Sequence, residues 1–118
     1  MAAFTFENPK VEFILGSDMV KLLEPIVTPE VTVPAGFYSD GASVPSAVDG
    51  IVHRYDRYLP AYIVHDFCYS VNSPVRRDVA DSILHVNLLR LGMDETKAEM
   101  ITLAVKQFGD SHFQGSKK

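Results

Sequence analysis

The chain has 118 residues, of which 47% are hydrophobic and 22% charged, and its formal net charge is -4. This length predicts one domain over residues 1–118, with a frayed tail at about 110–118. No face rich in lysine and arginine is apparent, which argues against a nucleic-acid binder. No apolar run approaches the roughly 20 residues that span a bilayer, and the start lacks the order of a signal peptide. We therefore expect a protein that is not transmembrane and is made in a cytoplasm.

The first third of the chain has the composition of short strands. Runs rich in valine, isoleucine, leucine and phenylalanine are separated by glycine, proline and asparagine, which favour turns. The runs are residues 4–6, 11–15, 20–27 and 31–33. Two to four strands alone are marginally stable, so helices must cover one face of the sheet. We expect a small, mostly antiparallel sheet over about residues 4–40.

A segment rich in glycine and proline, residues 33–50, follows the strands. Asp40 and Gly41 form a strong turn signal, and Ser43 or Ser46 could cap a short helix. One interpretation is a simple connection from the sheet to the helices. The other is that this loop folds over the next helix and brings Asp40, Ser43 or backbone groups to a site, because binding groups often lie on loops.

Three helices are predicted after this loop, which makes the fold class α+β. The first, residues 58–72, is apolar around its whole circumference and is expected to be buried at the centre. The second starts with Ser73 as cap and Pro74 in its first turn, and ends at Gly92. Asp94 caps the third, which runs from about residue 95 to 108 and ends at Gly109.

The predicted core faces of the second and third helices are apolar rows at helical spacing. The rows are Val79, Ile83 and Val86 with Ala80, Leu84, Leu88 and Leu91 on the second helix, and Ala98, Ile101, Val105 and Phe108 on the third.

Two polar residues, His65 and Asp66, stand in the middle of the apolar central helix. Burying them is costly unless each finds a partner. They diverge by about 100° on the helix, and Tyr69 lies one turn from both. If the first two helices form an antiparallel hairpin, Asp81 approaches the middle of the central helix. His65, Tyr69 and Asp81 then form one cluster, in which Arg77 can pair with Asp81.

This cluster permits two interpretations. In the first, the carboxylate of Asp81 fixes the tautomer of His65, whose other nitrogen accepts a proton from water or a hydroxyl. Asp66, pointing elsewhere, could then bind a hard cation together with the loop at 40–45. In the second, the same groups form a satisfied buried network that fixes helix packing.

Two other kinds of site have weaker support. The single cysteine and four scattered histidines give no recognisable zinc spacing. Cys68 beside a histidine suggests a nucleophile, but on an apolar helix it fits an inert core thiol better.

Three segments together resemble a family of small proteins from tailed bacteriophages and prophages, the domain of unknown function family numbered 1353. The segments are VPAGFYSDGASVP at 33–45, VHDFCY at 64–69 and RDVAD at 77–81. The resemblance covers nearly the whole chain. It implies a phage origin and an α+β fold, and it carries no settled biochemical activity.

A second, local resemblance concerns HDFCY at 65–69, which is similar to the catalytic helix of secreted phospholipases A2. There the histidine activates a water, the next aspartate binds calcium, the tyrosine supports the network, and an aspartate on a later antiparallel helix orients the histidine. The resemblance places these roles on His65, Asp66, Tyr69 and Asp81. The disulfides of that family and its glycine-rich calcium loop are missing here.

Two functions follow as hypotheses. The first is a virion component of the tail, baseplate or connector, in contact with other virion proteins, with an architectural His65 network and no cofactor. The second is a small calcium-assisted hydrolase acting on host envelope lipid or another ester. In it His65 is the base and Asp81 and Tyr69 orient it, Asp66 and Asp40 hold calcium, and support comes from the residues Arg77, Ser43 and Gly41. The broad family resemblance favours the first. An inhibitor of a host enzyme would leave no signature in the sequence.

Overall fold

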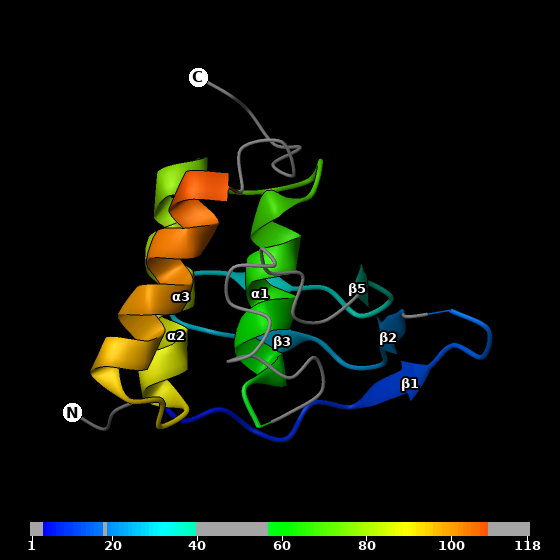
Figure 1. Ribbon diagram of the computed structural model, residues 1–118. Helices are drawn as coiled ribbons and strands as arrows, with labels where there is room; N and C mark the ends of the chain where they lie inside the picture. The colour runs from blue at the N-terminus through cyan, green and yellow to red at the C-terminus, as the bar shows by residue number, and fades with distance from the viewer. Residues whose placement is uncertain (1–3, 18, 40–56, 109–118) are drawn as a thin grey trace.

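The computed structural model describes residues 4–17, 19–39 and 57–108 (Figure 1). In these ranges short strands precede three helices, which confirms the α+β class. The strands are β1 (Val11–Phe13), β2 (Val20–Leu22), β3 (Ile26–Val27), β4 (Thr32–Val33) and β5 (Tyr38–Ser39); the helices are α1 (Leu59–Tyr69), α2 (Arg77–Arg90) and α3 (Glu95–Phe108).

The strands pair in antiparallel fashion, as predicted, but form two small sheets. One has the order β1-β2-β5 and the other is the hairpin β3-β4. The predicted run at 20–27 is divided into β2 and β3, because Pro25 has no N–H for a sheet ladder. Residues 4–6 are not a strand, and β5 was not foreseen. It follows Gly36, whose φ of 91° allows a tight turn before the chain returns to β2.

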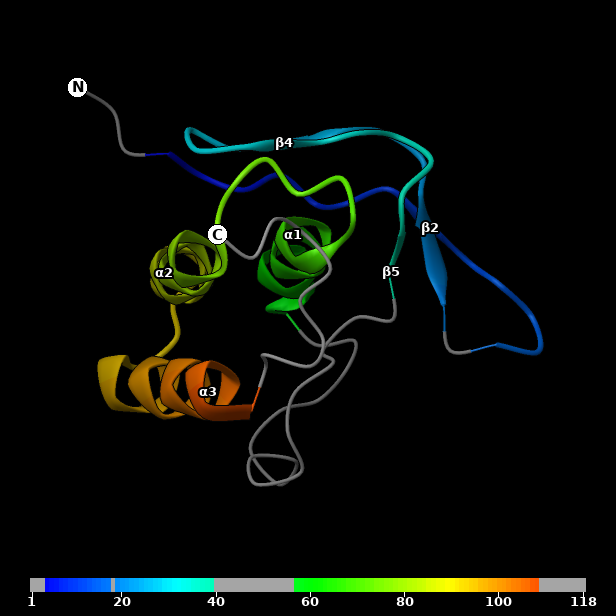
Figure 2. The same ribbon diagram turned by 90° about the horizontal axis from the view of Figure 1, so that it is seen from above.

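Helix α1 is the buried centre that its composition predicted. It contacts β4 and β5 on one side and α2 on the other, and Figure 2 shows it enclosed between the strands and α2. Ala61, Ile63 and Val64 are no more than 1% exposed. Nine of the eleven residues of α1 are buried, and His65 and Asp66 are the two that keep partial exposure. The polar pair therefore lies where the central helix approaches the surface.

Helix α2 runs antiparallel to α1 (Figure 1) and begins later than predicted. The hydroxyl of Ser73 donates to the carbonyl of Val75 at 2.8 Å and accepts from its N–H at 3.2 Å, so it closes a local turn and caps no helix. Gly92, with φ of 94°, follows the end of the helix as expected. The prediction for Val79 was wrong, since its side chain is 39% exposed while Ile83 is buried.

Helix α3 packs on α2 and has the predicted start. A carboxylate oxygen of Asp94 accepts the N–H of Lys97 at 3.2 Å, and Ala98, Ile101 and Val105 are buried. The predicted stop at Gly109 lies outside the described residues. In the described part of the chain, no helix has the length and apolar character needed to cross a membrane.

Arg90, near the end of α2, ties the N-terminal region to the helices. Its guanidinium donates to both carboxylate oxygens of Glu30, at 2.7 and 2.8 Å, and lies 5.3 Å from the centre of the Phe4 ring. The pKa of Glu30 is lowered, mainly by this hydrogen bonding to Arg90. Glu30 stands in the turn between β3 and β4, so Arg90 fixes this hairpin over α2. The sequence offered no signal for a pair 60 residues apart.

Candidate functional site: a histidine and a buried aspartate between two helices

The antiparallel hairpin of α1 and α2 brings His65 and Asp81 together. Nε2 of His65 lies 3.0 Å from Oδ1 of Asp81. The hydroxyl of Tyr69, one turn further along α1, donates to the same oxygen at 2.6 Å. The rings of His65 and Tyr69 are 4.2 Å apart, centre to centre, and tilted by 43°. The expected cluster of His65, Tyr69 and Asp81 is therefore present, and we call it the His65 cluster.

Burial affects two members of this cluster, Asp81 and Tyr69. Asp81 is 2% exposed, and a buried carboxylate needs hydrogen-bond donors to remain stable. The pKa of Tyr69 is raised, first by burial and then by its hydrogen bond to Asp81. The phenol therefore keeps its proton at neutral pH and serves as a donor.

The arrangement also selects the tautomer of His65. An ionised carboxylate can only accept hydrogen bonds, so a neutral imidazole bonded to it through Nε2 carries its proton on that nitrogen. Nδ1 then has a lone pair, and no hydrogen bond in the described part of the chain uses it. The side chain of His65 remains 12% exposed. Chemically, the ring is a proton acceptor held in a fixed orientation at the edge of the core.

Arg77 contacts the His65 cluster through Tyr69. Its Nε–H donates to the hydroxyl of Tyr69 at 3.3 Å. Its NH2 group donates to the backbone carbonyls of Val105, at 3.4 Å, and Lys106, at the C-terminal end of α3. Arg77 therefore connects the His65 cluster to α3 through Tyr69.

The described residues do not test the predicted metal site, whose ligands are Asp66 and Asp40 with Gly41 and Ser43 as supporting residues. Asp66 is partly exposed on α1, whereas Asp40, Gly41 and Ser43 lie outside the described ranges. Within those ranges, no group of three histidine, cysteine, aspartate or glutamate side chains could hold a metal ion. Asp66 alone supplies one ligand where calcium takes six to eight. The described residues thus do not form a calcium site, and the pairing of Asp66 with Asp40 stays a prediction.

Cys68 has the properties of a core thiol. Its side chain is fully buried, and burial raises the pKa of the thiol to about 12. The thiolate, which is the nucleophilic form, is therefore scarce at neutral pH.

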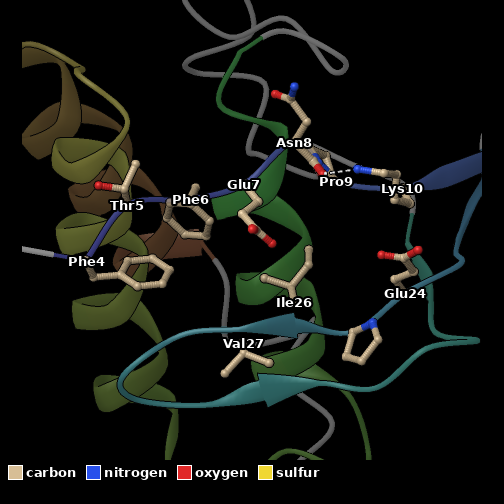
Figure 3. A pocket seen from close by; sticks show the side chains of 11 residues that line it. Phe4, Thr5, Phe6, Glu7, Asn8, Pro9, Lys10, Glu24, Ile26 and Val27 are labelled. Carbon is tan, nitrogen blue, oxygen red and sulfur yellow. Dashed lines mark hydrogen bonds between the residues drawn. The ribbon is translucent and has the colours of Figure 1, made fainter.

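Two hollows in the described part of the chain lie away from the His65 cluster. One, of about 240 Å³, separates residues 4–10 from residues 24–27, with Glu7 and Ile26 at its middle (Figure 3). The other, of about 330 Å³, lies between α2 and α3 and contains His85, whose Nε2 is 3.2 Å from a carboxylate oxygen of Glu95. The geometry of that contact is not that of a hydrogen bond. Neither hollow was predicted.

Fold and site together define a small α+β protein that holds a histidine–aspartate pair between two antiparallel helices. The chain belongs to the family described as protein of unknown function (DUF1353), whose model matches residues 21–105. The matched range contains the whole His65 cluster. No curated protein and no solved structure matches the chain.

Proposed function

We propose that this protein is a small hydrolase in which His65 removes a proton from an attacking water. One observation carries the proposal: Nε2 of His65 is 3.0 Å from the buried carboxylate of Asp81, which leaves Nδ1 as the basic atom of the ring. A positioned histidine that takes up a proton accelerates ester hydrolysis by about 100- to 10,000-fold.

Each residue of the His65 cluster has a role in this reaction. Nδ1 of His65 accepts the proton of the water as the water attacks the ester carbonyl. The imidazolium that forms is stabilised by Asp81, whose charge is already held in place by the hydroxyl of Tyr69. The proton then passes from Nδ1 to the leaving alcohol.

The partial exposure of His65 supports catalysis over pure architecture. A buried polar side-chain atom normally has a hydrogen-bond partner. Here one nitrogen is bonded to Asp81, the other takes part in no hydrogen bond of the described chain, and the side chain reaches the surface.

The substrate class follows from the resemblance of residues 65–69 to the catalytic helix of secreted phospholipases A2. We propose a lipid ester of the host envelope as substrate, with calcium as the cation that Asp66 and Asp40 would bind. No step of the mechanism above depends on that ion.

The test measures fatty-acid release from vesicles of phosphatidylethanolamine and phosphatidylglycerol, with calcium or with chelator. His65→Ala should lower turnover at least about 100-fold. His85→Ala is the matched control, because His85 is the other helical histidine of the described chain and lies in the hollow between α2 and α3. Its turnover should equal that of the unchanged protein. Asp66→Asn should remove any dependence on calcium.

The outcome separates the two interpretations of the cluster. No fatty-acid release by the unchanged protein, with and without calcium, together with a markedly lower melting temperature for His65→Ala, would mean that the cluster only holds the helices together. Turnover that survives in His65→Ala would exclude His65 as the base.

A second candidate, a virion component of phage origin, draws support from the hairpin of β1 and β2. This hairpin extends away from the helices (Figures 1 and 2), and β1 lies at the edge of its sheet. Leu15, at its tip, is 97% exposed. An edge strand with an exposed apolar tip suits contact with another protein chain.

Mass spectrometry of particles purified from a producing strain tests this candidate. The chain should be present in the particles at a fixed copy number, and Leu15→Glu should reduce its incorporation. A protein found only in the soluble lysate would contradict a virion role, and it would leave the hydrolase proposal standing. The two functions are compatible in one protein.

A further inference from the structure

Arg77 occupies a position that its own helix disfavours. It is the first residue of α2, where the helix macrodipole presents partial positive charge. A cation at this end destabilises the helix, whereas the negative charge of Asp78, the next residue, stabilises it. The placement of Arg77 therefore calls for stabilisation from outside α2.

That stabilisation comes from the opposite end of another helix. The guanidinium donates to the carbonyls of Val105 and Lys106, in the last turn of α3. The last carbonyls of a helix lack partners within it and carry partial negative charge. Arg77 thus closes the end of α3 while its Nε remains directed at Tyr69.

We propose that Arg77 is a positioning residue that links the end of α3 to the tautomer and orientation of His65. The guanidinium can only donate, so the oxygen of Tyr69 accepts from it and turns its own proton toward Asp81. Asp81 then accepts from Tyr69 and from Nε2 of His65 at one oxygen. The hydrogen bonds thus run from Arg77 Nε to Tyr69 and from Tyr69 to Asp81, which also accepts from His65. The bonds from Arg77 to Val105 and Lys106 hold the guanidinium at the end of α3. The catalytic consequence rests on the hydrolase function proposed above; the hydrogen-bond consequence does not.

A neighbouring residue provides the matched control. Arg76 has the same side chain and pairs with Asp78 at 2.8 Å on the surface, where its side chain is 65% exposed. The variants to compare are Arg77→Met, Arg77→Lys and Arg76→Met. Lysine can reach one set of carbonyls as a point charge, but it cannot donate to Tyr69 and to α3 with one rigid fork.

The first measurement is the imidazole Nε2–H proton of His65 by nuclear magnetic resonance, with its exchange rate and the nitrogen shifts that report the tautomer. We expect a slowly exchanging Nε2–H in the unchanged protein and in Arg76→Met. In Arg77→Met the exchange should be clearly faster, because Tyr69 then loses the donor that turns its proton toward Asp81. Arg77→Lys should recover the melting temperature without recovering slow exchange.

The second measurement is turnover with the lipid vesicles. If the hydrolase function is correct, Arg77→Met should lower kcat about 10-fold with little change in KM. Absence of turnover in every variant, with exchange still dependent on Arg77, would overturn the hydrolase and retain the positioning role. Unchanged exchange and tautomer in folded Arg77→Met or Arg77→Lys would overturn the positioning role.

Discussion

Tyr69 and His65 donate to the same oxygen atom of Asp81, at 2.6 and 3.0 Å. One buried carboxylate therefore holds two side chains of α1 against α2. Because Asp81 is 2% exposed, water cannot easily take its place as acceptor of these two hydrogen bonds if the carboxylate is changed. The stability of the helical hairpin and the orientation of the candidate base depend on the same atom.

Asp81→Asn should lower the free energy of unfolding by about 1–3 kcal/mol, because two charge-assisted hydrogen bonds weaken in a buried place. Asp78→Asn is the control, since Asp78 lies on the same helix with its side chain 66% exposed. The loss at Asp78 should be clearly smaller than the loss at Asp81, because solvent screens the exposed carboxylate. Urea unfolding of the three proteins measures both values. Equal losses at the two positions would mean that the buried hydrogen bonds of Asp81 add no particular stability.

The pairing of His65 with Asp81 could be predicted from the sequence, because it depends only on helical spacing and on the assumption that α1 and α2 form an antiparallel hairpin. His65 and Tyr69 share a face of α1 by helical spacing, and a short connection makes α1 and α2 antiparallel neighbours. The contacts of Arg77 with Tyr69 and α3 could not be predicted from the sequence. An arginine four residues before an aspartate suggests a pair on one helix, whereas the structure directs its donors to Tyr69 and α3.

Some helix boundaries and core residues could likewise be predicted from the sequence, and others could not. Asp94 was recognised as a cap because the capping bond involves residues three positions apart. Ser73 has the same chemistry but closes a turn, and the start of α2 moved to residue 77. With the start fixed, Ile83 faces the core and Val79 is partly exposed, which a row of apolar letters could not distinguish.

Substitutions of Ile83 and Val79 test directly which face of α2 packs in the core. Ile83→Ala should lower the free energy of unfolding by about 2–4 kcal/mol, because it leaves a cavity in the core. Val79→Ala should change it by less than about 1 kcal/mol, since the side chain is 39% exposed and alanine favours helix. Chemical unfolding of both variants measures the difference. A larger loss at Val79 would mean that α2 presents a different face to the core.

Cys68 should resist modification while the protein is folded. With a pKa of about 12, about one thiol in 10,000 is ionised at pH 8, and the side chain is fully buried. Native protein mixed with a thiol reagent should therefore react far more slowly than protein unfolded in guanidinium. Cys68→Ala should retain hydrolysis of lipid vesicles wherever the unchanged protein shows it. Rapid labelling of the native protein, or loss of turnover in Cys68→Ala, would reopen the role of Cys68 as a nucleophile.

Glu30 and Arg90 give the fold a dependence on acid pH. The pKa of Glu30 in the folded protein lies below its ordinary value of 4.5, mainly because of hydrogen bonding to Arg90. A group with a depressed folded pKa contributes stability above its unfolded pKa, and the contribution is lost as the pH falls through the folded pKa. Arg90 stays protonated throughout this range.

The difference in free energy of unfolding between the unchanged protein and Glu30→Gln should therefore be constant from about pH 5.5 to 7. It should be at most about 1 kcal/mol, because the pair is partly exposed to solvent. Below pH 4.5 it should shrink toward zero as the carboxylate is protonated. Other acidic groups cancel in the comparison, so this difference reports on Glu30 alone. A difference that stays the same at pH 3 would show that the hairpin of β3 and β4 is held over α2 by packing, without help from the charge of Glu30.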